Sequence, residues 1–257
     1  QSIERHPARQ HTIPDLSLVI VTVCSYPEGT LLPKLAMSVH SIYATLHEYQ
    51  YIVYTESPSD TRPPAWGKIR ALREVMLQGL WEWVLWVDCD LFFMDLRTSI
   101  DYILSKYALY TGRHTASTVQ ILFSEDSQML NTAFLLLRAS AWSVELLDRV
   151  WGSEDSPFTN HTWWEQAALA NELLGANHAR LKDVWYDPAN GVQGLSAMDA
   201  PGAYPPAVRI VPQFEVNSYH PISSFDGRVG DMWVPGRFAL SFNGVQSLTS
   251  KTVASVL

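Results

Sequence analysis

The sequence predicts an α/β fold in which a mostly parallel central sheet is flanked by helices. Over the first ninety residues, three short apolar runs rich in β-branched and aromatic residues alternate with two segments of helical periodicity. Such alternation builds parallel strands joined by right-handed crossovers. The third apolar run ends in Asp88-Cys89-Asp90. Because open α/β sheets bind ligands at the carboxyl ends of their strands, we expect the functional site at this triplet.

The first half of the chain is expected to form three strands and two helices. The strands are predicted over residues 16–23, 51–54 and 81–87. The first helix is predicted to begin near Pro33, and the second to cover residues 66–78 and end at Gly79. Their apolar faces are predicted to be Leu35, Val39, Ile42 and Leu46 in the first helix, and Ile69, Leu72, Val75 and Met76 in the second.

The second half of the chain is less regular. Strands are predicted over residues 131–137, 208–211 and 238–242, and helices over 140–151 and 164–174. Residues 1–14 have no periodicity and are expected to be a linker or the remnant of a stalk. Residues 15–257 are long enough for one large core, so we expect a single domain.

Composition argues against several kinds of partner. The chain has 257 residues, 47% of them apolar, with a formal net charge of −8 and an isoelectric point near 5.4. Nucleic acids and anionic membranes are bound by clustered Lys and Arg, so no nucleic acid is expected as a partner. No apolar run reaches the roughly 18 residues that a membrane-spanning helix needs. We expect no membrane contact by this fragment.

The two cysteines, Cys24 and Cys89, are not in a spacing typical of metal ligands. Two cysteines do not make a disulfide framework, and we expect no bridge between them. The redox compartment therefore stays open at this stage. Asn160-His161-Thr162 is a glycosylation sequon that matters only in a secretory lumen.

The acidic triplet suits a divalent cation. Side chains at positions i and i+2 of an extended backbone point to the same side, so Asp88 and Asp90 are expected to face one ligand. At a separation of about 5 Å and an effective dielectric of about 20, two carboxylates repel by roughly 3 kcal/mol. A shared proton or a hard, oxygen-seeking cation relieves this repulsion. The alternative is a solvated turn, and the apolar runs on both sides of the triplet argue against it.

A series of motifs in chain order resembles a known family. The motifs are Trp66-Gly67-Lys68, Asp88-Cys89-Asp90, Asn131-Thr132-Ala133-Phe134, Glu165-Gln166, Val211-Pro212-Gln213, Asn217-Ser218-Tyr219 and Phe242-Asn243-Gly244. Over residues 17–246 they resemble glycosyltransferase family 34, the galactosyl, mannosyl and xylosyl transferases. The resemblance implies a GT-A fold, a UDP- or GDP-linked sugar as donor and a divalent cation, usually Mn²⁺. It also implies transfer with retention of configuration to an oligosaccharide or glycoprotein acceptor.

The resemblance assigns roles near the acidic triplet. Asp90 is expected to bind the metal directly, and Asp88 to contact the ribose or the metal. Lys68 is expected to bind phosphate or to orient Asp88, and its alternative is an ordinary solvated helix lysine. Base recognition is expected in the loop Cys24-Ser25-Tyr26, where Tyr26 either stacks on the base or covers the core.

Three further residues are expected to contact the reacting sugar. Asn131 matches a residue that touches the donor sugar or the acceptor, although the family's Gly is Ala133 here and its Ser is absent. Glu165 and Gln166 match an Asp-Gln pair beside the anomeric carbon, with Gln166 on the reacting face. The alternative for Glu165 is a helix N-terminal carboxylate favoured by the macrodipole.

The chain departs from the family pattern near its carboxyl end. A His-Phe-x-Gly segment, whose His is a metal ligand, corresponds to Ser241-Phe242-Asn243-Gly244, and a phosphate-binding Lys corresponds to Gln246. Gly244 keeps the predicted contact to the donor. A hydroxyl is a poorer neutral ligand than imidazole, so either Ser241 or His220 is expected to complete the metal site.

The prediction is a metal-dependent retaining glycosyltransferase of the secretory pathway, in the Golgi lumen, whose parent chain is anchored upstream of residue 1. A cytoplasmic location stays open. The first alternative is a catalytically weakened module of the same fold that binds a nucleotide sugar or glycan. The second is a phosphatase of the haloacid dehalogenase type, in which an Asp-x-Asp pair follows the first strand and Thr or Val comes two residues later. Here the pair follows the third strand, and that position is Phe92.

Overall fold

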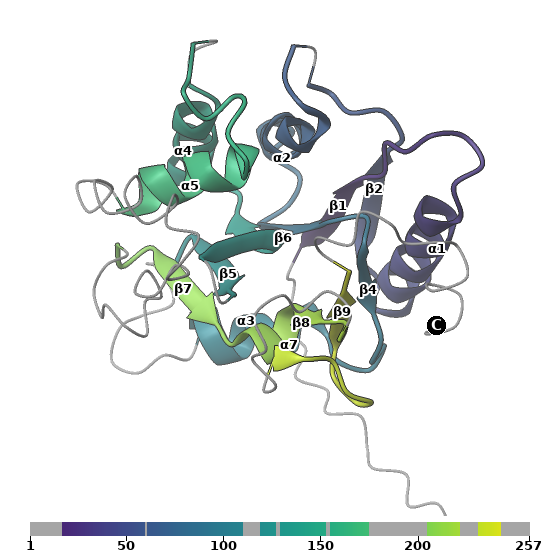
Figure 1. Cartoon of the computed structure of the whole chain (residues 1–257). Helices are drawn as coiled ribbons and strands as arrows, with labels where there is room; N and C mark the ends of the chain where they lie inside the picture. The colour runs from purple at the N-terminus through teal and green to yellow at the C-terminus, as the bar shows by residue number, and fades with distance from the viewer. Residues whose placement is uncertain are drawn as a thin grey trace, which may run out of the picture.

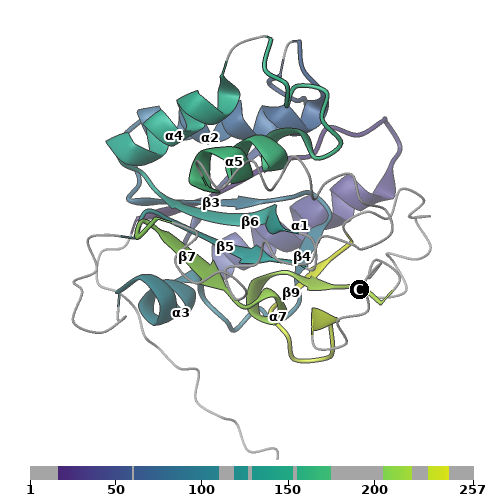
Figure 2. The ribbon, with the colours of Figure 1, turned by 60° about the vertical axis from the view of Figure 1, so that its left-hand side comes forward.

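The protein is a layered α/β molecule in which helices cover both faces of a twisted sheet (Figures 1 and 2). The computed structural model describes residues 17–59, 61–109, 119–126, 129–152, 155–174, 205–221 and 231–242. The predicted linker at residues 1–14 and the predicted site residue Gly244 lie outside the described residues, as does Gln246.

The central sheet has six strands in the order β2-β1-β3-β6-β5-β7. Neighbouring strands run parallel in the pairs β1/β2, β1/β3 and β5/β7 and antiparallel in β3/β6 and β5/β6. The predicted α/β class with a mostly parallel central sheet is therefore confirmed. The strands are β1 (Leu18–Val23), β2 (Gln50–Tyr54), β3 (Trp83–Val87), β5 (Ile121–Glu125), β6 (Leu130–Arg138) and β7 (Val208–Val211).

Strand β5 was not predicted from the sequence, and it explains why β6 runs against its neighbours. Only residues 126–129 separate β5 from β6, and so short a connection can join antiparallel strands but not parallel ones. Parallel pairing needs a crossover such as α1 between β1 and β2. The hairpin places the first residues of β6 beside the carboxyl end of β3, because Val87 pairs with Phe134.

Two helical layers sandwich the sheet. Helices α2 (Gly67–Leu77), α4 (Ala141–Trp151) and α5 (Trp164–Leu174) cover one face, and α1 (Leu31–Leu46) and α3 (Ile100–Leu104) cover the other (Figure 2). Alternate strand residues supply the two cores, since Val19 and Val21 pack under α2 whereas Leu18 and Ile20 pack under α1. A 3₁₀ turn (Pro64–Trp66) precedes α2, and a π-helical turn (Ser105–Leu109) follows α3. No helix in the described ranges is both long and apolar enough to cross a bilayer.

Helix α1 begins two residues before Pro33, and its predicted face is partly wrong. Ile42 and Leu46 are 57% and 58% exposed. The buried face instead includes His40 and Tyr43, whose polar atoms find partners in the Leu91 carbonyl (2.7 Å) and the Thr98 carbonyl (2.8 Å). A buried aromatic ring whose polar group is hydrogen-bonded removes more surface from water than an aliphatic side chain does. The helix is therefore rotated so that His40 and Tyr43 face the core.

A second, three-stranded sheet brings the carboxyl-terminal part of the chain to the acidic triplet. It has the order β4-β9-β8, formed by β4 (Leu91–Phe93), β9 (Ala239–Ser241) and β8 (Ser218–Tyr219), the last preceded by α7 (Gln213–Val216). Strand β4 begins directly after Asp90, and the Phe242 amide donates to the Asp90 carbonyl (3.1 Å). The predicted approach of residues 238–242 to the triplet is therefore present.

Candidate functional site

The acidic triplet forms a tight turn at the carboxyl end of β3. The Asp88 amide donates to the Ala133 carbonyl of β6 (2.9 Å), and the Leu91 amide donates back to the Asp88 carbonyl (3.0 Å). The expected extended backbone from Asp88 to Asp90 is therefore wrong, because the chain must reverse between β3 and β4. The two aspartates still lie close enough that the charge of Asp88 raises the pKa of Asp90.

The carboxylates of the pair have different surroundings. Asp88 Oδ1 accepts hydrogen bonds from Trp86 Nε1 (2.6 Å) and from Lys68 Nζ (3.0 Å). Asp90 has no ion pair with any residue in the described part of the chain. Burial, and then the charge of Asp88, raise the pKa of Asp90 to about 7. Negative charge therefore exceeds positive charge at this turn, as expected of a site built to receive a cation.

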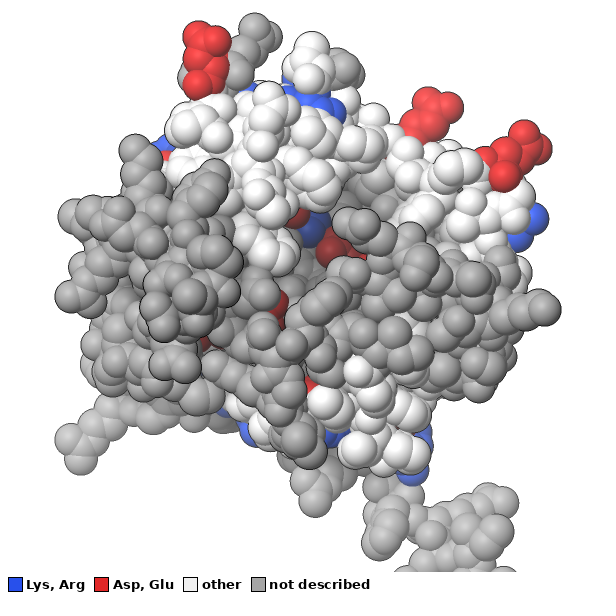
Figure 3. All heavy atoms as spheres, viewed as in Figure 1, with Lys and Arg blue, Asp and Glu red and all other residues white. Residues whose placement is uncertain are grey.

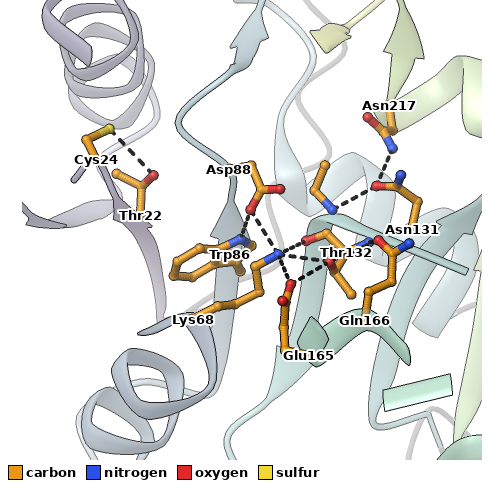
Figure 4. A network of polar contacts seen from close by, with 11 residues as sticks. Thr22, Cys24, Lys68, Trp86, Asp88, Asn131, Thr132, Glu165, Gln166 and Asn217 are labelled. Carbon is orange, nitrogen blue, oxygen red and sulfur yellow. Dashed lines mark hydrogen bonds and ion pairs between the residues drawn. The ribbon is translucent and has the colours of Figure 1, made fainter. Parts of the chain in front are cut away.

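Lys68 is the hub of the site (Figure 4). It is 4% exposed, and its ammonium contacts Asp88 Oδ1 (3.0 Å), Glu165 Oε1 (3.0 Å) and Thr132 Oγ1 (2.8 Å). The alternative of a solvated helix lysine is wrong. Burial alone would lower the pKa of Lys68, but the two carboxylates outweigh burial and raise it. Lys68 is therefore a fixed cation that holds Asp88 toward α5.

The residues before Lys68 explain how it is held. A Cβ on Gly67 would stand 2.2 Å from Ser57 Oγ and 2.9 Å from Pro58 Cδ, so only glycine allows the 57–59 loop to pack on the start of α2. Trp66 is fully buried, and its Nε1 donates to the Thr159 carbonyl (3.2 Å) in the loop before α5. The Trp66-Gly67-Lys68 motif thus fixes α2 against both flanking loops.

Glu165 and Gln166 lie in the first turn of α5 and point into the same network (Figure 4). Glu165 is buried on Lys68, and burial raises its pKa although Lys68 opposes the shift. Its predicted alternative, an N-terminal helix carboxylate, describes its position, but the carboxylate also has a specific partner. Gln166 Oε1 accepts from the Thr132 amide (3.1 Å). No described residue bonds its Nε2 group, so that donor is available to a ligand.

Asn131 is held by protein groups on every side. Its Nδ2 donates to Asp126 Oδ2 (3.0 Å) and to the Tyr219 hydroxyl (2.7 Å). Its Oδ1 accepts from the Ala133 amide (2.8 Å) and from Asn217 Nδ2 (2.9 Å). An amide side chain offers two donors and one acceptor oxygen, and these bonds occupy both donors and the oxygen of Asn131. The geometry favours a role for Asn131 in shaping the site over the predicted direct contact with a sugar.

Cys24 and Cys89 form a disulfide, so the expectation of two unbridged cysteines is wrong. The physical reason is the register of β1 and β3. Val21 pairs with Trp86, and three residues further along each parallel strand the same register brings Cys24 opposite Cys89, with their Cα atoms 5.2 Å apart. The bridge therefore links the predicted base-binding loop to the middle residue of the acidic triplet.

The rest of that loop is open to solvent. Ser25 and Tyr26 are exposed, so the alternative in which Tyr26 covers the core is not what the structure shows. Partial burial, and then the charges of Asp90 and Asp88, raise the pKa of Tyr26 above its usual range. The predicted stacking of Tyr26 on a base stays a prediction.

The candidate third metal ligands lie on opposite faces of the small sheet. Ser241 pairs with Leu91 and is fully buried, and its Oγ has no hydrogen-bond partner. The His220 ring stacks on Phe242 (5.2 Å between centroids), one residue on and hence on the other face. Within the described ranges, no three His, Cys, Asp or Glu side chains converge on a metal position. The third ligand stays a prediction.

Sequence reasoning missed several residues of the site. Thr132 and Trp86 complete the contacts of Lys68 and Asp88, and Asp126 and Tyr219 complete those of Asn131. Asp126 directly follows β5, the strand that was not predicted, so its place at a strand end was not recognised. Figure 3, viewed as in Figure 1, shows atoms of acidic and basic residues recessed in a hollow near the middle of the visible face.

An α/β sheet of this order, with paired aspartates in a turn at the end of β3, is the GT-A fold of glycosyltransferases. The chain belongs to the galactosyl transferase GMA12/MNN10 family, whose model matches residues 19–247. The phosphatase alternative is therefore wrong.

Curated relatives support the same class. The chain is 28% identical over 127 residues to "Xyloglucan 6-xylosyltransferase 4" of Arabidopsis thaliana, a match that covers 49% of this chain and 24% of that protein. It is 37% identical over 90 residues to "Probable glycosyltransferase 3" of Oryza sativa subsp. indica, covering 32% of this chain and 18% of that protein. The matched region thus spans about a quarter or less of these relatives.

One solved structure shares the fold across nearly the whole chain. It is a glycosyltransferase involved in the glycosylation of the major capsid of PBCV-1, with a TM-score of 0.61 and 13% sequence identity. The superposition covers 94% of this chain and 100% of that one. At this identity the likeness supports the architecture.

Proposed function

We propose that the chain is a metal-dependent, retaining glycosyltransferase that moves a galactose, xylose or mannose from a UDP- or GDP-linked donor to a glycan or glycosylated protein. The observation that carries the proposal is the Asp88-Cys89-Asp90 turn at the carboxyl end of β3, with its excess negative charge. Family membership supports the reaction class. The name of the Arabidopsis relative supports a xylosyl donor and a glycan acceptor as the first pair to test.

The donor set of the turn fits a divalent cation. Asp90 is a hard ligand, and so is Asp88 Oδ2, the oxygen that Lys68 and Trp86 do not contact. The diphosphate of the donor would supply further oxygens. Mn²⁺ or a similar cation bound there would supply Lewis-acid stabilisation of the charge that develops on the departing diphosphate. In this arrangement Lys68 keeps Asp88 in place instead of binding phosphate itself, since its ammonium already has three protein partners.

The protein residues position the reactants. The available Nε2 donor of Gln166 would hydrogen-bond the sugar or the diphosphate next to the reacting carbon. The bond between the anomeric carbon and the diphosphate oxygen breaks, and a bond to the acceptor oxygen forms on the same face. The acceptor's hydroxyl proton passes to the leaving phosphate. Such chemistry depends mainly on orientation and charge stabilisation.

Retention by this front-face route is supported by the engagement of the nearby carboxylates. Asp88 and Glu165 both bind Lys68, and Asp126 accepts from Tyr219 and Asn131. A carboxylate committed to such partners is a poor nucleophile. Among the described residues, none of these groups is placed as a covalent catalyst.

Calorimetry and turnover test the proposal. Wild-type chain is titrated with UDP-xylose, UDP-galactose and GDP-mannose, with and without Mn²⁺, and transfer to xyloglucan and mannan oligosaccharides is followed by mass spectrometry. We expect Mn²⁺-dependent binding and transfer, and a loss of affinity of at least about tenfold in Asp90→Asn. Asp148→Asn, which changes an exposed surface ion pair, is the matched control and should behave as wild type.

The same experiment separates the second candidate function, a binding module without turnover. This candidate is motivated by Ser241, which stands where relatives are expected to carry a metal-binding His. Ser241 is fully buried and faces the core. Donor binding that is indifferent to Mn²⁺, with no product over many hours, would establish the binding module and end the proposal of catalysis.

We also propose that the protein works in the secretory pathway, in the Golgi lumen. The support is the Cys24–Cys89 disulfide, which persists in oxidising compartments, and the exposure of Asn160 and Thr162 in the sequon. Expression through a secretory host should add an N-glycan to the wild-type chain and none to Thr162→Ala. An unmodified wild-type chain with reduced cysteines would contradict this location.

A further inference from the structure

The side chain of Thr132 lies between the two halves of the site (Figure 4). Thr132 belongs to β6 and is 3% exposed. Its Oγ1 lies 2.8 Å from Lys68 Nζ on one side and 3.2 Å from Gln166 Oε1 on the other. Lys68 holds Asp88 of the acidic turn, and Gln166 carries the amide donor that we propose to face the sugar. One buried hydroxyl thus contacts both groups.

Thr132 decides which end of the Gln166 amide faces the protein. Gln166 Oε1 accepts from the Thr132 backbone amide (3.1 Å) and from the Thr132 hydroxyl (3.2 Å). A backbone N–H can only donate, so the side-chain atom opposite it must be the oxygen. The reversed amide would place one N–H group against another. The Nε2 group of Gln166 therefore points away from Thr132, where no described residue accepts from it.

The hydroxyl of Thr132 also has a defined direction. Lys68 has no acceptor, so its ammonium donates to Thr132 Oγ1, and the hydroxyl uses its own proton elsewhere. The acceptors in reach are Glu165 Oε1 and Gln166 Oε1, both at 3.2 Å. Branching at Cβ restricts the rotation of a threonine side chain, which helps to keep this arrangement. The hydroxyl thus accepts from α2 and donates toward the first turn of α5.

Lys68 does not depend on this hydroxyl to hold the acidic turn. Its three ammonium protons face four acceptors, which are Asp88 Oδ1 and Glu165 Oε1 (both 3.0 Å) and the hydroxyl (2.8 Å) and carbonyl (3.1 Å) of Thr132. Loss of the hydroxyl leaves one acceptor for each proton. The Asp88 amide also bonds the Ala133 carbonyl (2.9 Å), a backbone contact that no side-chain change removes. The hydroxyl therefore matters more to Gln166 than to the acidic turn.

We infer that Thr132 is a positioning residue for the transfer. It fixes the Gln166 amide so that Nε2 faces the donor sugar, at a set position relative to the diphosphate site at Asp88 and Asp90. This inference rests on the proposed function. When a reaction depends on orientation, a small misplacement of one group reduces the rate by more than the strength of a single hydrogen bond. Loss of the hydroxyl should therefore reduce turnover more than it weakens nucleotide binding.

Thr132→Val tests the inference, because valine has nearly the same shape and lacks the hydroxyl. With UDP-xylose, Mn²⁺ and a xyloglucan oligosaccharide, we expect kcat to fall about tenfold, while the Kd of UDP with Mn²⁺ changes less than about twofold. Thr132→Ser keeps the hydroxyl and should recover most of the lost kcat. Thr98→Val removes a hydroxyl bonded to Asp95 Oδ2 (3.1 Å) in the loop beside α1. It is the matched control and should keep the wild-type kcat.

Two further variants separate positioning from a general loss of structure. Thr132→Ala makes the same measurement without the methyl group that valine places beside the Lys68 ammonium, so a folding defect of Thr132→Val does not decide the outcome. If Thr132 acts through Gln166, kcat of Thr132→Val/Gln166→Ala should be close to that of Gln166→Ala alone, because the amide to be positioned is already gone.

The possible outcomes are distinct. Losses of kcat that multiply in the double variant, or a wild-type kcat in folded Thr132→Val and Thr132→Ala, overturn the positioning role and leave the proposed function intact. A Kd of UDP that rises as much as kcat falls assigns the hydroxyl to the metal side of the site and also overturns that role. Absence of transfer by the wild-type chain with every donor and acceptor ends the proposed function and this inference with it.

Discussion

Cys89, the middle residue of the acidic turn, is covalently bonded to Cys24 at the end of the neighbouring strand β1. The bridge ties the two loops predicted to hold the base and the diphosphate into one unit. It lies in a small core with Phe92, Leu240 and Phe242, which belong to β4 and to β9 and its end. The position of the paired aspartates is therefore fixed by a bond that depends on redox state.

Reduction of this disulfide should lower both stability and metal affinity. The bonded residues are 65 positions apart, and closing such a loop restricts the unfolded chain by about 4 kcal/mol. Thermal unfolding with and without a phosphine reductant, and Mn²⁺ titration of Cys24→Ser/Cys89→Ser, measure the two effects. Phosphine-treated double variant is the control, since it has no bond to lose. Equal melting temperatures of oxidised and reduced wild type would contradict the prediction.

The Lys68–Glu165 contact should show strong coupling. Lys68→Met leaves the buried Glu165 and the partly exposed Asp88 without their cation, and breaking the buried Lys68–Glu165 pair in this way costs about 3–5 kcal/mol. Glu165→Gln should cost less, because Asp88 still balances Lys68. In the double variant Lys68→Met/Glu165→Gln part of the loss should return. Urea unfolding of the four proteins measures the coupling free energy, and simple additivity would show that the contact is not formed.

His40 should make stability fall as pH falls. Burial lowers the pKa of His40 to about 4, partly opposed by its hydrogen bond to the Leu91 carbonyl, whereas the unfolded chain titrates near 6.5. Below pH 6.5 the unfolded state binds a proton that the folded state refuses. About 3 kcal/mol is therefore lost between pH 6.5 and 4. The difference between wild type and His40→Gln isolates this contribution from other groups, and parallel stability curves would refute it.

Local patterns predicted the first half of the fold well. Residues 66–78 were predicted as a helix and form α2 over 67–77, because apolar residues at helical spacing and a following glycine are sufficient signals. The face of α1 was not predictable in the same way. His40 and Tyr43 are buried only because β4 and the Thr98 loop offer carbonyls to them, and those partners lie some fifty residues away in sequence.

The sequence predicted those site residues that directly follow a recognisable strand. It did not predict the contacts that depend on how distant strands pair. Asp88 and Asp90 follow a recognisable strand, so their edge position was predicted. The Cys24–Cys89 bridge follows from the parallel register of β1 and β3, which no single segment encodes. The hydrogen bonds that occupy the Asn131 amide depend on Tyr219, which is 88 residues away, and on the unpredicted strand β5. Contacts between distant segments carry the roles that motif order alone could not assign.

Gly67 should be intolerant of even one added methyl group. A Cβ would meet Ser57 Oγ at 2.2 Å and Pro58 Cδ at 2.9 Å, so Gly67→Ala must displace the loop or the start of α2. We expect a loss of about 1–3 kcal/mol in the free energy of unfolding, with a weaker Mn²⁺ titration because Lys68 follows directly. Ser57→Ala/Gly67→Ala removes the closest atom and should recover part of both. Wild-type stability of Gly67→Ala would mean that the loop does not pack there.

Gln166 and Asn131 should separate catalysis from structure. Gln166 keeps an amide donor that no described residue uses, so Gln166→Ala should reduce kcat by about tenfold or more while the melting temperature falls little.

Asn131 has its amide engaged by Asp126, Tyr219 and Asn217. Asn131→Ala leaves buried partners unsatisfied and should destabilise the fold by about 1–3 kcal/mol. Asn131→Asp keeps the shape but faces the Asp126 carboxylate without a donor, so it should be no better than Ala. If Asn131→Ala instead kept wild-type stability and lost only turnover, Asn131 would be a direct sugar contact, as the motif order first suggested.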